Sequence, residues 1–89
     1  MTKTEYYQKF EKSFAYPGLH CALIFHHDPI LDVLESRAIY SESRQEAWSW
    51  FDTTCEFYRK HKINFIGSFD GIFEGCYGDV NQYLEEEEN

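Results

Sequence analysis

The triplet His26-His27-Asp28 contains the residue types that could most directly do chemistry. Imidazole and carboxylate groups bind zinc or transfer protons near neutral pH. Residues 19–27 are typical of a β-strand, in which adjacent side chains point to opposite faces, so His26 and His27 do not easily share one metal ion. His20 would share the face of His26 but lie about 20 Å away along the strand. A strand end with an Asp-Pro turn is the simpler interpretation, and a small metal or hydrolytic protein is kept as a third hypothesis.

Other signatures of catalysis are missing from the sequence. A nucleophilic site needs Cys or Ser beside a base in a cleft, whereas Cys21 and Cys55 fall at apolar positions typical of a core. No GxSxG motif, P-loop or dinucleotide-binding fingerprint occurs. The acidic residues of DGIFEGCYGD lack the regular oxygen-ligand spacing of an EF-hand. We therefore expect a protein that is not an enzyme and that has no catalytic residue, bound metal or cofactor.

Acidic residues dominate the C-terminal third of the chain. Residues 1–63 contain all eight Lys and Arg and nine Asp and Glu, for a net charge of −1, whereas residues 64–89 contain seven acidic residues and no Lys or Arg, for a net charge of −7. Such a field repels nucleic acid and anionic membranes and attracts basic protein surfaces. The terminal run EEEE could be a solvated tail. If a last helix continues through it, Glu85 and Glu88 share a face about 5–6 Å apart, and fixed carboxylates could imitate DNA phosphates.

These charges define a candidate surface for binding a basic protein partner. Charges at the rim of an interface chiefly raise the association rate and the specificity, so tight binding also needs aromatic anchors. The predicted surface consists of the acidic residues Asp70, Glu74, Asp79, Glu85, Glu86, Glu87 and Glu88, with Tyr77 and Tyr83 as apolar anchors.

Length and composition indicate one small domain. The chain has 89 residues, of which 43% are apolar, and its eight Phe, seven Tyr and two Trp are many for a core of this size. Some aromatic surface should therefore remain outside, where it can serve an interface. The odd set of Cys21, Cys55 and Cys76 fits reduced thiols. The N-terminus lacks a signal-peptide run, and the apolar stretch CALIF is too short to span a bilayer. These features favour a cytoplasmic protein.

Helical periodicity identifies the elements that position the candidate residues. Apolar residues at spacings of four behind a Thr2–Glu5 capping box predict a helix over residues 3–15. A second capping box, Ser43 to Glu46, opens a helix over about 44–61. Asp79 is placed to cap a short last helix.

Runs of β-favouring residues predict the strands. The near-continuously apolar stretch 19–27 is expected to be a central strand. Residues 30–42 favour its hairpin partner, although a short helix started by Asp28 and Pro29 is an alternative. Residues 63–69 and 72–77 flank Asp70-Gly71, a two-residue hairpin signal. Together these elements predict an α+β domain, in the order α-β-β-α-β-β-α, over residues 1–84. Its antiparallel sheet has three to four strands with helices mainly on one face. Residues 85–89 form an acidic C-terminal tail.

In size, net charge, lack of catalytic motifs and its C-terminal YLEEEEN, the chain resembles small acidic phage-encoded proteins that block host defence, such as anti-CRISPR and anti-restriction inhibitors. The resemblance implies an inhibitor in the host cytoplasm that mimics nucleic acid. It would present the acidic surface to a nucleic-acid-binding complex and block its ligand, without binding nucleic acid or membrane itself. A second hypothesis is an accessory α+β domain that forms a homodimer through a sheet edge or exposed aromatics.

Overall fold

A four-stranded antiparallel sheet forms the centre of the computed structural model, which describes residues 1–12 and 16–85. The strands are β1 (His20–Asp28), β2 (Val33–Ser41), β3 (Phe65–Phe69) and β4 (Ile72–Tyr77), in the spatial order β2-β1-β3-β4. The helices are α1 (Lys3–Lys12) and α2 (Arg44–Lys60), and η1 (Val80–Tyr83) is a single 3₁₀ turn. The predicted α+β class and antiparallel sheet are confirmed, with four strands. No helix in the described part of the chain is long and apolar enough to cross a membrane.

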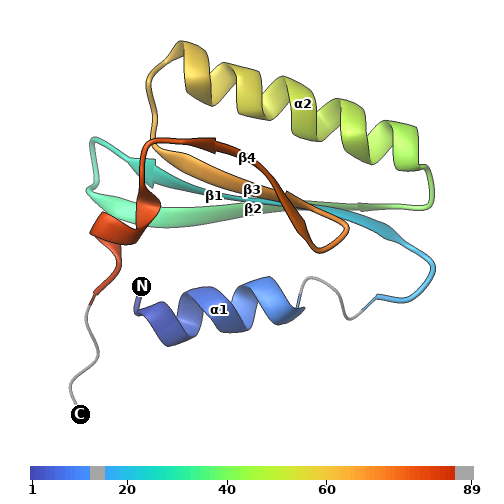
Figure 1. Ribbon diagram of the computed structural model, residues 1–89, viewed down its shortest axis with the longest axis horizontal. Helices are drawn as coiled ribbons and strands as arrows, with labels where there is room; N and C mark the ends of the chain where they lie inside the picture. Colours follow the sequence, from blue (N-terminus) through green and yellow to red (C-terminus); the bar gives the residue numbers. More distant parts are fainter. Residues whose placement is uncertain (13–15, 86–89) are drawn as a thin grey trace.

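Strand β1 is buried on both faces, as its near-continuous apolar sequence predicted. Ala22 and Ile24 belong to a core beneath α2, whereas Leu23 and Phe25 belong to a core on the opposite face. The prediction of helices mainly on one face is therefore wrong, because α2 covers one face and α1 covers the other (Figure 1). A single helical layer would leave Leu23 and Phe25 in water, at a cost of about 1.5–3 kcal/mol each.

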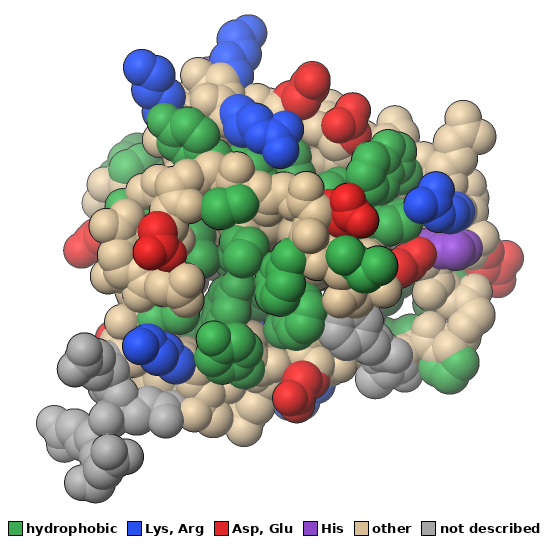
Figure 2. All heavy atoms as spheres, viewed as in Figure 1, with side chains coloured by type: hydrophobic (Ala, Val, Ile, Leu, Met, Phe, Trp, Pro, Cys, Tyr) green, Lys and Arg blue, Asp and Glu red, His purple; other side chains and the backbone are tan. Residues whose placement is uncertain are grey.

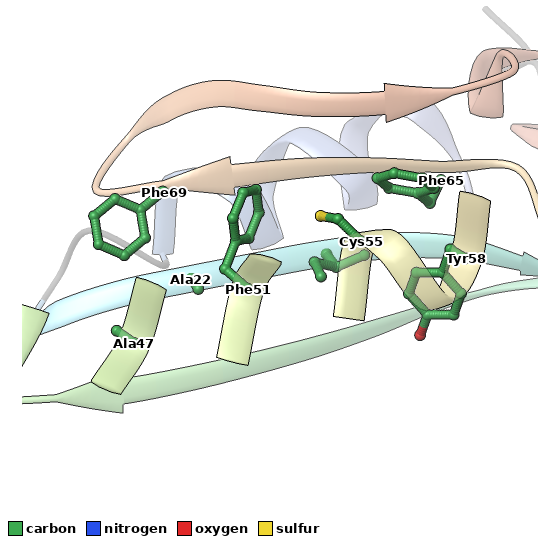
Figure 3. Close-up of a cluster of buried hydrophobic side chains, with 8 residues drawn as sticks. Ala22, Ala47, Phe51, Cys55, Tyr58, Phe65 and Phe69 are labelled. Carbon is green, nitrogen blue, oxygen red and sulfur yellow. The ribbon is translucent and has the colours of Figure 1, made fainter. Parts of the chain in front are cut away.

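The core beneath α2 is built from aromatic rings and small residues. Side chains from α2 point down onto the sheet and meet Phe65 and Phe69 of β3 (Figure 3). Gly67, between these two residues, lets the helix approach, because a Cβ there would lie 2.6 Å from Cε2 of Phe51. The helix begins at the predicted cap, where Ser43 Oγ accepts a hydrogen bond from the Glu46 N–H at 3.2 Å.

The core on the other face places α1 and η1 against the sheet. The ring of Tyr6 lies 4.5 Å from that of Phe25, and Leu34, Val80 and Leu84 complete the buried cluster. Burial raises the pKa of Tyr6 to about 12. Thr2 Oγ1 accepts from the Glu5 N–H at 3.2 Å, which confirms the first capping site. The predicted end of this helix at residues 13–15 lies outside the described residues.

The hairpin formed by β1 and β2 decides between the strand and the short helix expected for residues 30–42. The strands pair without a break from His20 opposite Ser41 to Asp28 opposite Val33. Asp28 does not start a helix, because its Oδ1 accepts from the N–H groups of Ile30 and Leu31 and so closes a turn. The strand interpretation is confirmed over Val33–Ser41.

Candidate protein-binding surface

The predicted acidic residues lie along one edge of the sheet. Asp70 is in the turn before the edge strand β4, Glu74 is within the strand, and Asp79 follows its end. At about 3.3 Å per residue, Asp70 and Asp79 lie less than about 30 Å apart along this edge. The three carboxylates are therefore spread along β4, the strand nearest the viewer in Figure 1, and do not form a compact cluster.

Asp70 is engaged in holding the β3–β4 turn onto β1. Its Oδ2 lies 2.8 Å from His20 Nδ1, and its Oδ1 accepts from the Cys21 N–H at 2.9 Å. Partial burial raises the pKa of Asp70, but the hydrogen bonds from His20 and Cys21 outweigh it and hold the pKa below its usual value. The carboxylate therefore favours its ionised form, and both of its oxygens are already engaged with β1.

The chain does not remain helical as it enters the glutamate run. Asp79 caps η1 as predicted, with Oδ1 accepting from the Asn81 N–H at 2.9 Å, but Leu84 is already extended. Leu84 is buried in the α1-side core, and the Glu85 N–H donates to the carbonyl of Met1 at 3.1 Å. The alternative in which the last helix continues into the run does not hold at Glu85, which forms an isolated β-bridge with Thr2. Glu86, Glu87 and Glu88 lie outside the described residues.

The two predicted tyrosine anchors are half-buried and make internal contacts. Tyr77 packs against the α2-side core. The ring of Tyr83 stacks on that of His27, with centroids 3.6 Å apart, and its hydroxyl accepts from Asn64 Nδ2 at 2.6 Å. Part of each side chain is therefore occupied by contacts within the protein.

Other apolar residues are exposed beside the acidic row. Phe10 of α1 and Phe73 of β4 stack in parallel with ring centroids 4.4 Å apart. Phe73 is 48% exposed on the α1 side of the sheet, and Ile72, its neighbour in the strand, is 63% exposed on the α2 side. Tyr7 of α1 is exposed, whereas Phe10 is partly buried against the α1-side core. We call Tyr7, Phe10, Ile72 and Phe73 the aromatic patch. Figure 2 shows hydrophobic side chains gathered in the middle of this face, between α2 and α1, with separate acidic side chains around them. The sequence predicted surplus aromatic surface but not its place, which depends on β4 being an edge strand.

The β4 edge is unsuited to pairing with a further β-strand, so a partner would contact its side chains instead. Gly67 pairs with Gly75 while Ser68 pairs with Phe73, so Glu74 is an extra residue that bulges from the ladder. A bulge and a charge in the middle of an edge strand discourage pairing with a further strand. This argues against a homodimer formed by joining two sheets at β4.

Basic side chains approach the edge without pairing with its carboxylates. Arg44 lies over the ring of Phe69 at 5.1 Å, and Arg59 lies over that of Phe65 at 5.6 Å. Within residues 1–12 and 16–85, every ion pair joins a carboxylate to a histidine, and none involves Lys or Arg. Glu74, Asp79 and Glu85 therefore keep their charge available to a partner.

The His26-His27-Asp28 triplet is divided between the two faces, as predicted. His26 lies beneath α2, with Nδ1 3.1 Å from the hydroxyl of Tyr58 and Nε2 3.4 Å from Oε2 of Glu35. His27 lies on the other face, with Nε2 2.7 Å from Oδ1 of Asp32. Among the described residues, no group of three or more His, Cys, Asp and Glu side chains is placed to hold a metal ion. Each member of the triplet has a structural contact, so this arrangement gives no support to the metal or hydrolytic hypothesis.

We expect stability to fall in mild acid because of His26. Burial lowers the pKa of His26 below its usual value of 6.5, an effect larger than the opposing effect of Glu35. The folded protein thus favours the neutral ring, and this stabilisation is present above pH 6.5 and is lost as the pH falls through the folded pKa. Urea unfolding at pH 7.5 and at lower pH values should show a smaller loss for His26→Gln than for the wild type. Equal losses would contradict the assignment.

Comparison with known proteins does not assign this chain to a family. Neither protein-family models, nor curated proteins, nor solved structures gave a match to the chain. Only the chemistry of its surface therefore indicates what the protein does. The β4 edge combines exposed apolar side chains with carboxylates that make no ion pair among the described residues, a combination suited to protein interfaces.

Proposed function

We propose that this protein is a non-enzymatic binding protein that covers a basic, nucleic-acid-binding surface of a partner protein and excludes the natural ligand. Residues 64–89 contain seven acidic residues and no Lys or Arg. A field of this sign steers the protein toward basic surfaces. Small acidic phage inhibitors of host defence, which the chain resembles in size and charge, are proposed as its functional class.

The exposure of Phe73 and Ile72 on either side of the β4 edge, beside Glu74, is the observation that carries this proposal. Phe73 and Ile72 can each contribute about 1.5–3 kcal/mol when fully buried against a partner. Glu74 lies next to Phe73 in the strand and forms no ion pair with any residue that the structure describes. An arginine of the partner could stack on the Phe73 ring and pair with Glu74, because its guanidinium group is suited to both contacts. The patch takes the anchoring role first assigned to Tyr77 and Tyr83.

The proposal is tested by affinity capture from the native host, followed by reconstitution of any retained partner. Three variants are compared with the wild type: a patch variant (Ile72→Ser/Phe73→Ser), an acidic variant (Glu74→Gln/Glu85→Gln) and a charge-matched control (Glu42→Gln/Asp52→Asn). Asp70 and Asp79 are left intact because their carboxylates hold turns in place. We expect the patch variant to bind at least about a hundredfold more weakly. The acidic variant should bind more weakly at low salt, and the control should bind as the wild type does.

Two further measurements decide the mode of action. The affinity of the wild type should fall as salt rises, and nucleic acid should compete with the protein for the partner. A complex that is insensitive to salt, to the patch variant and to the acidic variant would rule out this surface. A partner that binds protein and nucleic acid simultaneously would rule out the blocking mechanism.

A further inference from the structure

The turn between β1 and β2 carries two aliphatic side chains into solvent. Ile30 is 90% exposed and Leu31 is 65% exposed, the highest values among the large hydrophobic residues that the structure describes. Val33 follows them and is also exposed. We call Ile30 and Leu31 the tip. Single exposed aliphatic residues are common on proteins, but two adjacent ones at the end of a hairpin form a projecting apolar knob.

Hydrogen bonds hold this tip in one conformation. Asp28 Oδ1 accepts from the N–H groups of Ile30 at 2.8 Å and Leu31 at 3.1 Å, and these bonds lower the pKa of Asp28. The Asp32 N–H donates to the Asp28 carbonyl at 2.8 Å, and Asp32 Oδ1 lies 2.7 Å from His27 Nε2. A tip that is already ordered loses little conformational entropy when it binds.

A shallow hollow lies on the surface of α2. It is lined by Thr53, Glu56, Phe57, Arg59 and Lys60. Phe57 is its large apolar residue and is exposed, and the two positive charges of Arg59 and Lys60 exceed the one negative charge of Glu56. The tip has the opposite charge, since Asp28 and Asp32 flank its aliphatic side chains and the Asp32 carboxylate is largely exposed.

We propose that the tip of one copy of this protein binds in the α2 hollow of a second copy. Ile30 and Leu31 pack on Phe57, with the flanking carboxylates facing Arg59 and Lys60. Tip and hollow lie at the same end of the sheet, because the Tyr58 hydroxyl of α2 is 3.1 Å from Nδ1 of His26, shortly before the tip. A twofold axis therefore lets each tip enter the other hollow and closes a dimer. Each copy has a net charge of −8, so the apolar contact must supply most of the affinity against mutual repulsion.

Sedimentation velocity and light scattering over a concentration series test the dimer. The wild type should reach twice the monomer mass of 10.7 kDa. A tip variant (Ile30→Ser/Leu31→Ser) and a hollow variant (Phe57→Ala/Lys60→Gln) should each dimerise at least about a hundredfold more weakly. These side chains are exposed, so both variants should keep the far-UV circular dichroism of the wild type. The matched control Ile72→Ser/Phe73→Ser should dimerise normally.

Mixing the two weakened variants gives the sharpest test. The tip variant keeps an intact hollow and the hollow variant keeps an intact tip, so the mixture should form a heterodimer through one restored contact. If the interface instead joined tip to tip or hollow to hollow, the mixed variants would not form a heterodimer. That result would overturn the proposal. The proposal also fails if the wild type is monomeric throughout, or if only the Ile72→Ser/Phe73→Ser variant loses the dimer.

Discussion

Phe65→Ala should lower the free energy of unfolding by about 3–5 kcal/mol, the range for removing a buried aromatic ring. Phe65 is fully buried on β3, an inner strand of the sheet. Its ring lies 5.6 Å from that of Tyr58 and beneath the guanidinium group of Arg59. Truncation leaves a cavity between α2 and the sheet and removes both ring contacts. Since small domains are stable by only about 5–15 kcal/mol in total, this one change should remove much of the stability.

Urea denaturation followed by tryptophan fluorescence measures this loss. Ile72→Ala on the neighbouring strand β4 is the matched control, because Ile72 is mostly exposed and should lose less than about 1 kcal/mol. Comparable losses for the two variants would show that the α2-side core is not packed around Phe65.

Gly78→Ala should destabilise the protein by about 2–4 kcal/mol, from two separate causes. Gly78 has a φ of +72°, a backbone conformation that costs a residue with a side chain about 1–2 kcal/mol. A Cβ at this position would also collide with the side chain of Asn64. Asn64 Nδ2 donates to the Tyr83 hydroxyl at 2.6 Å, and Tyr83 stacks on His27. Displacing Asn64 therefore disturbs the contacts that hold η1 on the sheet.

Gly18→Ala separates these two causes. Gly18 also has a positive φ, of +83°, but a Cβ there would meet nothing within 4 Å. It should show only the backbone cost of about 1–2 kcal/mol. Thermal and urea unfolding of both variants measure the difference, which reports the collision with Asn64. Equal destabilisation by the two substitutions would contradict the role given to Asn64 and Tyr83.

The two proposed surfaces have a common physical origin. A short chain with many large apolar residues, folded around a single sheet, cannot bury all of them. Part of this remainder lies at the β4 edge and at the tip of the β1–β2 hairpin, where Ile30, Leu31 and Ile72 have the largest exposed fractions among the large hydrophobic residues described. Each lies beside acidic residues, whose field favours a basic counterpart. The patch is proposed to meet a partner protein, and the tip is proposed to meet a second copy.

The sequence by itself determined the local elements. The capping residues Thr2 and Ser43 and the apolar spacing behind them predicted the starts of α1 and α2, because caps and helical faces depend on residues three to four positions apart. The Asp70-Gly71 turn and the apolar run of β1 likewise predicted the hairpin of β3 and β4 and the central position of β1. The concentration of negative charge after residue 63 is also a property of the sequence alone.

The tertiary structure decided which faces and edges are covered. The sequence shows that β1 is apolar on both sides, but only the packing places α2 on one face and α1 on the other. It also makes β4 an edge strand, which exposes Phe73 and Ile72, while it turns Tyr83 inward onto His27. These outcomes depend on contacts between residues far apart in the chain. Local periodicity carries no information about such partners, because an exposed aromatic side chain and a buried one can occupy the same position in a strand pattern.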